Sequence, residues 1–236
     1  GETQIDAGSC TAAQEGMKMR SASGQPLRDP NRRVLGNYNP DWTGGWANSF
    51  SYRGLNLSVL LDTKQGGDIY SVTNQWGTYA GVLEETVPGR CIPAGGTPVE
   101  GMPTCSPENM ILVPNSVRVT ASGDTVPNVG DDAIYIDSQS YWGAPGVFAT
   151  TETNVYDASF VKLRDITLTY DVPVSLAERL RVSGLQVGVT GRNLALWTDT
   201  PNIDPETAFD ASNVQGLEFG QIPTARSIGF NVSIQP

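Results

Sequence analysis

The feature that most constrains the fold of this chain is a two-residue alternation of apolar and polar side chains. Near the end of the chain, Ile228, Phe230, Val232 and Ile234 are apolar, and each residue between them is small or polar. Successive side chains of a β-strand point to opposite sides, so one face of such a strand leaves water and the other does not. A strand of a soluble β-sandwich and a strand of an outer-membrane barrel both satisfy this rule.

Five stretches with alternating patterns are predicted to be strands. They cover residues 44–52, 55–61, 158–172, 185–197 and 228–234 approximately. The alternation changes parity near Arg164–Asp165 in the third stretch and near Gly191–Arg192 in the fourth. Because a β-bulge is the ordinary cause of such a change, we expect a bulge in each of these two strands.

Short and long connections alternate between the predicted strands. Two residues join the first pair, and a short helical turn joins the third and fourth, with capping-box spacing at Ser175 and Glu178. Long segments, residues 63–157 and 198–224, form the other two connections. Short periplasmic turns and long external loops are typical of outer-membrane barrels. The sequence therefore predicts an all-β fold, an antiparallel transmembrane β-barrel segment of about five strands with long extracellular loops.

Five strands cannot close a barrel. Bacterial barrels have an even number of strands, and an open edge in lipid leaves backbone groups unpaired. We therefore expect residues 43–236 to supply carboxyl-terminal strands and external loops to a larger barrel, and residues 1–42 to be an extracellular loop segment. The partners of this segment would be the remainder of the same barrel and the lipid bilayer.

Composition excludes several function classes. The formal net charge of −10 is incompatible with a nucleic-acid-binding surface, which needs clustered Lys and Arg. The chain has no histidine, no phosphate-binding loop motif and no C-x-x-C pair. We therefore predict that it is not an enzyme, and we expect no cofactor apart from the calcium ion considered below.

Cys91 and Cys105 lie in one Gly/Pro-rich segment, "CIPAGGTPVEGMPTC". The turns of this segment could bring the two thiols together, so a disulfide is predicted, with two free thiols as the alternative. Cys10 would then remain, with a partner outside this chain.

Several residues are candidates for substrate binding. Tyr141 and Trp142 could offer an aromatic platform to a sugar ring or a protein, or they could pack the core of their own loop. Arg192 interrupts an apolar alternation and could face a barrel lumen or bind a plug. In the stretch "NIDPE", Asp204 and Glu206 could fix a turn by accepting backbone hydrogen bonds, with a substrate role as the alternative.

Acidic residues in "GDDAIYID" are weak calcium candidates. Asp131, Asp132 and Asp137 supply the hard oxygen atoms that calcium prefers. No EF-hand pattern is present, and a solvated acidic loop is the alternative.

The chain resembles a known family along most of its length. The segments "LGNYNPDWTGGWANSFSYRGLNLSVLLDTKQGGDIY", "DASFVKLRDITLTYDVP", "LQVGVTGRNLALWT", "NIDPE" and "FGQIPTARSIGFNVSI", in this order, resemble the carboxyl-terminal part of the SusC/RagA family of TonB-dependent outer-membrane transporters. The chain departs from the family at its end, where "SIQP" replaces the usual terminal aromatic residue. This departure puts the barrel-assembly signal in question.

The resemblance implies a barrel of about 22 strands with an internal plug. It also implies a segment that contacts TonB and a SusD-like surface lipoprotein as partner. The function implied is TonB-dependent import of glycans or peptides across the outer membrane of a Gram-negative-type bacterium. The alternative reading is a secreted β-sandwich that acts as a carbohydrate-binding or adhesion module.

The positions of four aromatic residues agree with a barrel. Tyr52 and Tyr170 fall at the predicted periplasmic strand ends, and Trp46 and Trp197 fall toward the outer ends, as interfacial girdles require. Packing in the core of a sandwich would explain the same residues.

Overall fold

The computed structural model describes residues 17–113, 115–120, 122–130, 133–143, 146–207 and 215–236. The chain divides into two compact units. Unit 1 consists of residues 1–35 and 71–155, and unit 2 consists of residues 36–70 and 156–236. Cys10, Asp131 and Asp132 lie outside the described residues.

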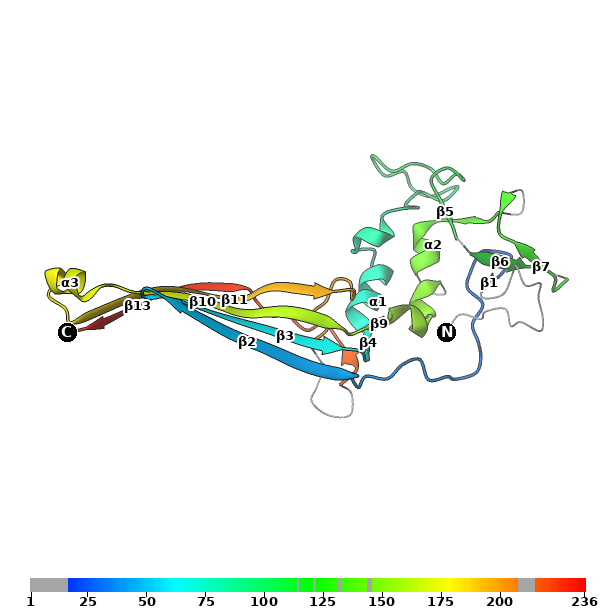
Figure 1. Ribbon diagram of the computed structural model, residues 1–236. Helices are drawn as coiled ribbons and strands as arrows, with labels where there is room; N and C mark the ends of the chain where they lie inside the picture. Colours follow the sequence, from blue (N-terminus) through cyan, green and yellow to red (C-terminus); the bar gives the residue numbers. More distant parts are fainter. Residues whose placement is uncertain (1–16, 114, 121, 131–132, 144–145, 208–214) are drawn as a thin grey trace. The chain divides into compact units, whose positions relative to one another are not determined.

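Unit 2 is built on a five-stranded antiparallel sheet (Figure 1). The spatial order is β13-β11-β10-β3-β2. The strands are β2 (Trp42–Tyr52), β3 (Leu55–Gln65), β10 (Phe160–Asp171), β11 (Gly184–Thr198) and β13 (Ser227–Gln235). All five predicted strands are thus confirmed, and each pairs only with its neighbours in this order.

The register of the sheet separates apolar from polar side chains. One row across the five strands is entirely apolar, and it consists of Phe50, Leu57, Leu168, Val189 and Phe230. The next row, which points to the opposite face, consists of Ser49, Ser58, Thr167, Thr190 and Gly229. The two-residue periods of five separate strands are therefore in phase across the whole sheet.

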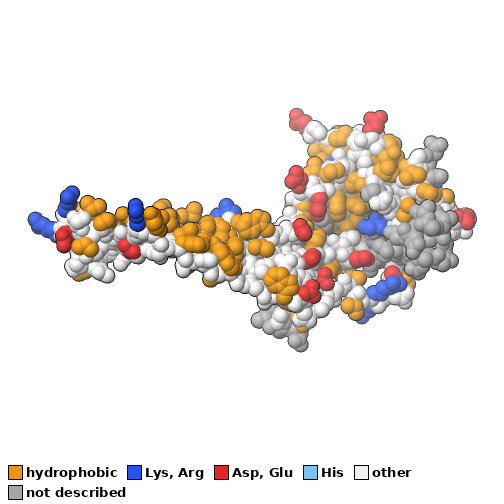
Figure 2. All heavy atoms as spheres, in the orientation of Figure 1, with side chains coloured by type: hydrophobic (Ala, Val, Ile, Leu, Met, Phe, Trp, Pro, Cys, Tyr) orange, Lys and Arg blue, Asp and Glu red, His pale blue; other side chains and the backbone are white. Residues whose placement is uncertain are grey.

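The apolar face of the sheet is not covered within unit 2. Trp46, Phe50 and Phe230 are 49%, 57% and 85% exposed. The second described sheet of unit 2 has the order β12-β4-β9 and consists of short strands that form no layer over this face. Figure 2 shows hydrophobic side chains gathered along the five-stranded sheet. An exposed apolar face of this kind is expected where a sheet contacts lipid hydrocarbon or another apolar layer.

Both predicted bulges are present and lie opposite each other. On β10 the register shifts between Leu163 and Asp165, so Arg164 is an extra residue relative to β3. Between the pairs Leu163↔Ala195 and Asp165↔Arg192, β11 carries two residues where β10 carries one. Asn193, one of the two, has a φ of 50°. The parity changes in the sequence therefore record a real irregularity shared by adjacent strands.

The short connections lie at one end of the sheet. Arg53 and Gly54 both have positive φ, 50° and 84°, as a two-residue hairpin turn with right-handed strand twist requires. The connection from β10 to β11 holds α3 (Val174–Ala177) and η5 (Glu178–Leu180). The end of the chain is near it, because Ser183 N donates to Gln235 O at 2.8 Å.

The predicted capping box in this connection is wrong. The N-cap of α3 is Pro173, which makes no side-chain capping bond, and Ser175 lies inside the helix. A proline with its φ fixed near −60° is pre-organised for a helix start, so the helix begins before the serine. Arg181, at a φ of 61°, ends the helical turn.

The small sheet of unit 2 adjoins the end of the five-stranded sheet that carries the long connections, because β4 follows β3 and β9 precedes β10 in the chain. It contains β12 (Leu217–Glu218), β4 (Asp68–Ser71) and β9 (Val155–Asp157). A small core of Ile69, Ala158 and Ile203 lies beside it, with Tyr156 packed against the core.

Unit 1 shows that residues 71–155 are not a structureless loop. Its helices are α1 (Val72–Tyr79), α2 (Ser138–Trp142) and the 3-10 turns η1 (Glu84–Thr86), η3 (Val147–Ala149) and η4 (Thr151–Asn154). Its strands are β1 (Lys18–Arg20), β5 (Ile111–Leu112), β6 (Ser116–Val119), β7 (Thr125–Pro127) and β8 (Tyr135–Ile136).

The division predicted at residue 42 differs from the compact units. β1 lies within residues 1–42 but pairs in parallel with β6, so part of this segment folds with residues 71–155. An external position for residues 1–42, 63–157 and 198–224 remains a prediction. Among the described residues, no helix is both long and apolar enough to cross a membrane.

Candidate functional site

The polar face of the sheet carries a buried charged cluster where β10 meets the connection between β11 and β13. Lys162 of β10 is 1% exposed. Its Nζ donates to Asp204 Oδ2 at 2.6 Å and to Glu206 Oε2 at 2.5 Å. Thr224 Oγ1, from the other end of the same connection, donates to Asp204 Oδ2 at 2.7 Å. Lys162 and Asp204 therefore join the beginning and the end of the connection between β11 and β13.

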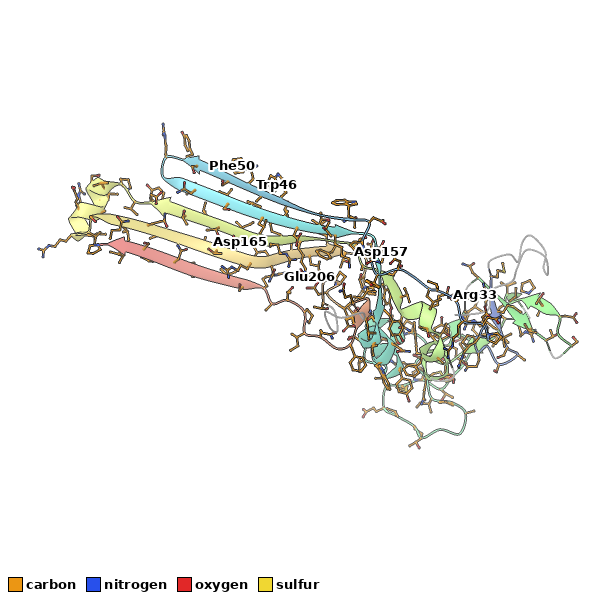
Figure 3. The ribbon with its side chains drawn as sticks, turned by 90° about the horizontal axis from the view of Figure 1, so that it is seen from below. Arg33, Trp46, Phe50, Asp157, Asp165 and Glu206 are labelled. Carbon is orange, nitrogen blue, oxygen red and sulfur yellow. A yellow bond between two sulfur atoms is a disulfide. The ribbon has the colours of Figure 1, made fainter. Side chains whose placement is uncertain are left out.

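Arg164, the bulge residue of β10, is the second cation of the cluster. Its Nη2 donates to Asp62 Oδ2 of β3 at 2.6 Å, and its Nη1 donates to Glu206 Oε2 at 2.7 Å. Nη2 also contacts Glu206 Oε1. Figure 3 shows Glu206 beside the loop end of the sheet, with Asp165 farther along β10. The guanidinium thus bridges the strand wall and the loop, a geometry that suits its planar fork of donors.

Asp204 fixes the turn of the "NIDPE" stretch, as the sequence suggested. Its Oδ1 accepts the backbone N–H of Glu206 at 3.1 Å, and its carbonyl accepts the Thr207 hydroxyl at 2.6 Å. The carboxylate is 2% exposed. Since Oδ2 receives Lys162 and Thr224, both carboxylate oxygens are occupied, and a direct bond to substrate would require breaking one of them.

The two loop carboxyls are held in their ionised forms. Burial raises the pKa of Asp204, but hydrogen bonds from Lys162, Thr224 and the Glu206 backbone together outweigh it, and the pKa lies below the ordinary value. For Glu206, the hydrogen bond from Arg164 is the largest influence and lowers the pKa, against an opposing effect of burial. A carboxylate with a lowered pKa that is already ion-paired is not a general acid.

The lowered pKa values predict that the loop holding Asp204 and Glu206 is released from the sheet at acidic pH. Ionised Asp204 and Glu206 stabilise the anchored loop fully above their ordinary pKa values of 3.8 and 4.5, and this stabilisation is lost as pH falls through the lower folded-state values. Hydrogen exchange of residues 199–207, corrected for intrinsic rates, should therefore be constant from pH 8 to 5 and should rise below about pH 4. A rise centred near pH 6 would show that other groups hold the loop.

Arg192 is not part of the cluster. It lies on the polar face of β11, its side chain is 70% exposed, and its Nε is 3.5 Å from Asp165 Oδ2. This exposed pair contributes little to stability. Of the five predicted substrate-binding residues, Asp204 and Glu206 meet in the charged cluster, and Tyr141 and Trp142 contact each other in unit 1.

Tyr141 and Trp142 lie in unit 1, on α2. Their rings pack edge to face with centroids 4.8 Å apart, and the Arg20 guanidinium lies 5.7 Å from the Tyr141 ring. Trp142 also lines a cavity of unit 1. Tyr141 thus has neighbours in its own unit, and Trp142 borders an open space.

The sequence reading missed the cations of the cluster. Lys162 and Arg164 carried one signal, because they place two positive charges near the start of a predicted strand. Their partners Asp62 and Thr224 carried none, since the pairing depends on strand register and on the return of a loop.

The structure joins Cys91 and Cys105 in a disulfide, as the sequence predicted, with Cα atoms 4.8 Å apart. Asp137, one of the calcium candidates, caps α2 by accepting the Ser140 N–H at 2.9 Å. The described residues contain no group of three or more His, Cys, Asp or Glu that could hold a metal ion. Calcium binding by this region remains a prediction.

Comparisons with known proteins agree with this architecture. No family model matches the chain. TonB-dependent receptor P26 of Formosa agariphila is 28% identical over 215 residues, which cover 85% of this chain and 18% of that protein. TonB-dependent receptor P3 of the same organism is 24% identical over 210 residues, 86% of this chain and 17% of that protein. The chain is similar to TonB-dependent receptors along most of its length.

A solved structure shows the same fold. The structure of the RagAB peptide transporter matches with a TM-score of 0.51 at 17% identity, over 84% of this chain and 17% of that one. The chain therefore shares the fold of part of that transporter. It spans less than a fifth of the length of the curated relatives it matches. The two curated relatives are named as receptors, and neither name gives an enzyme activity.

Proposed function

We propose that the protein to which this chain belongs imports nutrients across the bacterial outer membrane with energy delivered through TonB. The observation that carries the proposal is the in-phase pair of rows across five strands, one apolar and exposed, the next polar. Lipid-facing and lumen-facing residues alternate in this way in transmembrane barrels. Receptor relatives along 85% of the chain support the assignment.

The ends of the strands support an orientation. On the apolar face, Tyr52 and Tyr170 lie near the short turns, and Trp46 and Trp197 lie toward the long connections. Aromatic girdles at both interfaces are typical of such barrels. We place the short turns in the periplasm and the long segments outside, in a Gram-negative-type cell envelope.

The partners follow from the same assignment. The remaining strands of the barrel would continue the sheet beyond β2 and β13, and a plug would contact the polar face, on which Arg192 is exposed. A SusD-like surface lipoprotein would cover the external segments, as the resemblance to the SusC/RagA family implies. The cargo would be a glycan or a peptide.

Fractionation and uptake together test the proposal. The full-length protein in its own host should sediment with the outer membrane and dissolve only in detergent, and growth on its cargo should require TonB. Recovery of the native protein as a soluble monomer in detergent-free buffer would contradict the proposal and favour a secreted binding module. Growth that is unaffected by loss of TonB would also contradict it.

A further inference from the structure

Unit 1 contains a cavity of about 350 Å³ that has no part in the barrel wall. Its walls come from the end of α1 (Thr78, Tyr79), from Arg90, from the disulfide loop at Met102 and from α2 (Gln139, Trp142). This volume is in the range of small-molecule sites, roughly 300–1,000 Å³. We name it the Arg90 cavity.

Arg90 is fixed in the wall of this cavity by neutral groups only. Its Nε donates to Thr86 O at 3.1 Å, and its Nη2 donates to Thr86 Oγ1 at 2.8 Å and to Gly81 O. Among the described residues, no carboxylate pairs with Arg90, and its Nη1 makes no hydrogen bond. A held guanidinium with a free nitrogen and no counter-charge is a pre-organised donor for an anionic group.

An arginine without a carboxylate partner is unusual in this acidic segment of the chain. Between Ser71 and Val155, Arg90 and Arg118 are the only basic residues, while acidic residues are frequent. Several glutamates lie near in the sequence, at positions 84, 85 and 100, yet none pairs with Arg90 in the structure. The positive charge is therefore available to a ligand in the cavity.

Two aromatic rings complete the walls. Tyr79 is held by Phe148, with centroids 4.5 Å apart, and Trp142 is held edge to face by Tyr141. The side-chain amide of Gln139 is exposed and makes no hydrogen bond to the described residues. Fixed rings beside a few free polar groups suit a ligand with an apolar ring face and hydroxyl groups.

We propose that the Arg90 cavity binds one sugar unit that carries an anionic substituent, a carboxylate or a sulfate ester. The guanidinium of Arg90 would receive the anion, Trp142 and Tyr79 would contact the ring, and Gln139 would bind hydroxyl groups. A compact sugar fits better than an extended peptide, because peptides are commonly bound along a strand edge and no residue that lines the cavity belongs to a strand. The proposal rests on the import function, in that the sugar is a unit of the cargo.

Calorimetry on the purified full-length protein tests the proposal. The probes are tetragalacturonate, its neutral methyl ester, a sulfated carrageenan tetrasaccharide, its desulfated form and a tetraglutamate peptide. We expect at least one acidic sugar to bind about tenfold or more tightly than its neutral counterpart and than the peptide, with affinity that falls as salt rises. The two acidic probes distinguish carboxylate from sulfate.

Variants place the binding in the cavity. Arg90→Gln and Trp142→Leu should each weaken binding of the acidic sugar about tenfold, and Arg90→Lys should retain part of it. Arg179→Gln removes the same charge from the exposed turn η5 in unit 2 and should leave affinity unchanged. Equal binding of acidic and neutral sugars by the wild-type protein, a preference for the peptide, or equal effects of the Arg90 and Arg179 changes would overturn the proposal. TonB-dependent growth is measured separately, so loss of the sugar site and loss of the import function are distinguishable.

Discussion

Arginine at Leu57 is expected to destabilise the folded protein by about 1–2 kcal/mol. Leu57 lies on the apolar face of β3, in the row between Phe50 and Leu168 and two residues from Leu55, which pairs with Tyr52 and Tyr170. A guanidinium at this position would be placed in hydrocarbon between the tyrosine row and the midplane of the bilayer, where its loss of hydration is not compensated. Urea unfolding of the full-length protein in lipid vesicles measures the change.

The matched control is arginine at the next residue, Ser58, which points to the polar face opposite Ser49 and Thr167. There the charge would remain in a polar lumen, and the expected change is within about 0.5 kcal/mol. Equal destabilisation by both substitutions would mean that the two faces meet similar environments, and the barrel reading would then fail.

Removal of the Lys162 charge is expected to release the last long loop. In Lys162→Met, Asp204 would be left buried with the Thr224 hydroxyl and a backbone N–H but without its cation, at a cost of about 3–5 kcal/mol. Hydrogen exchange in residues 199–207 and 215–226 should rise, while the β10–β11 ladder stays protected because its backbone bonds are unchanged.

Two further variants separate the buried pair from a general loss of charge. The double variant Lys162→Met with Asp204→Asn should recover most of the protection, because neither charge then remains unpaired and the amide oxygen can still accept the Glu206 N–H. Arg192→Gln, which breaks the exposed contact with Asp165, should change exchange little. A double variant that exchanges as fast as Lys162→Met alone would show that the lysine holds the loop by packing rather than by charge.

The five strands of the sheet could be predicted because the pattern that identifies each strand lies within its own residues. A period of two in each strand indicates which side chains share a face, and a change of parity near Arg164 indicates a bulge, so strands and irregularities are both visible in the sequence. The alternation of two-residue and long connections gave the arrangement of turns at one end. The helix start was missed because Pro173 outweighs the Ser175 and Glu178 spacing.

The candidate site was only half predictable. Asp204 and Glu206 are visible as a turn motif, but their cations lie 42 and 44 residues earlier in the chain, on a strand. No local pattern reports a contact at that separation. Unit 1 was read as loop for a related reason: its strands have two to four residues, too few to show a period.

The placement of the apolar face in hydrocarbon is the central claim, and spin labels at two adjacent residues test it most directly. Nitroxides are attached to single cysteines at Phe230 and Asn231, in the full-length protein in lipid vesicles, and their collision rates with oxygen and with a water-soluble nickel complex are compared. The label at residue 230 should collide with oxygen and not with nickel, and the label at residue 231 should show the opposite preference. Equal access of nickel to both labels, or shielding of residue 230 from both reagents, would contradict the assignment of this sheet to a membrane wall.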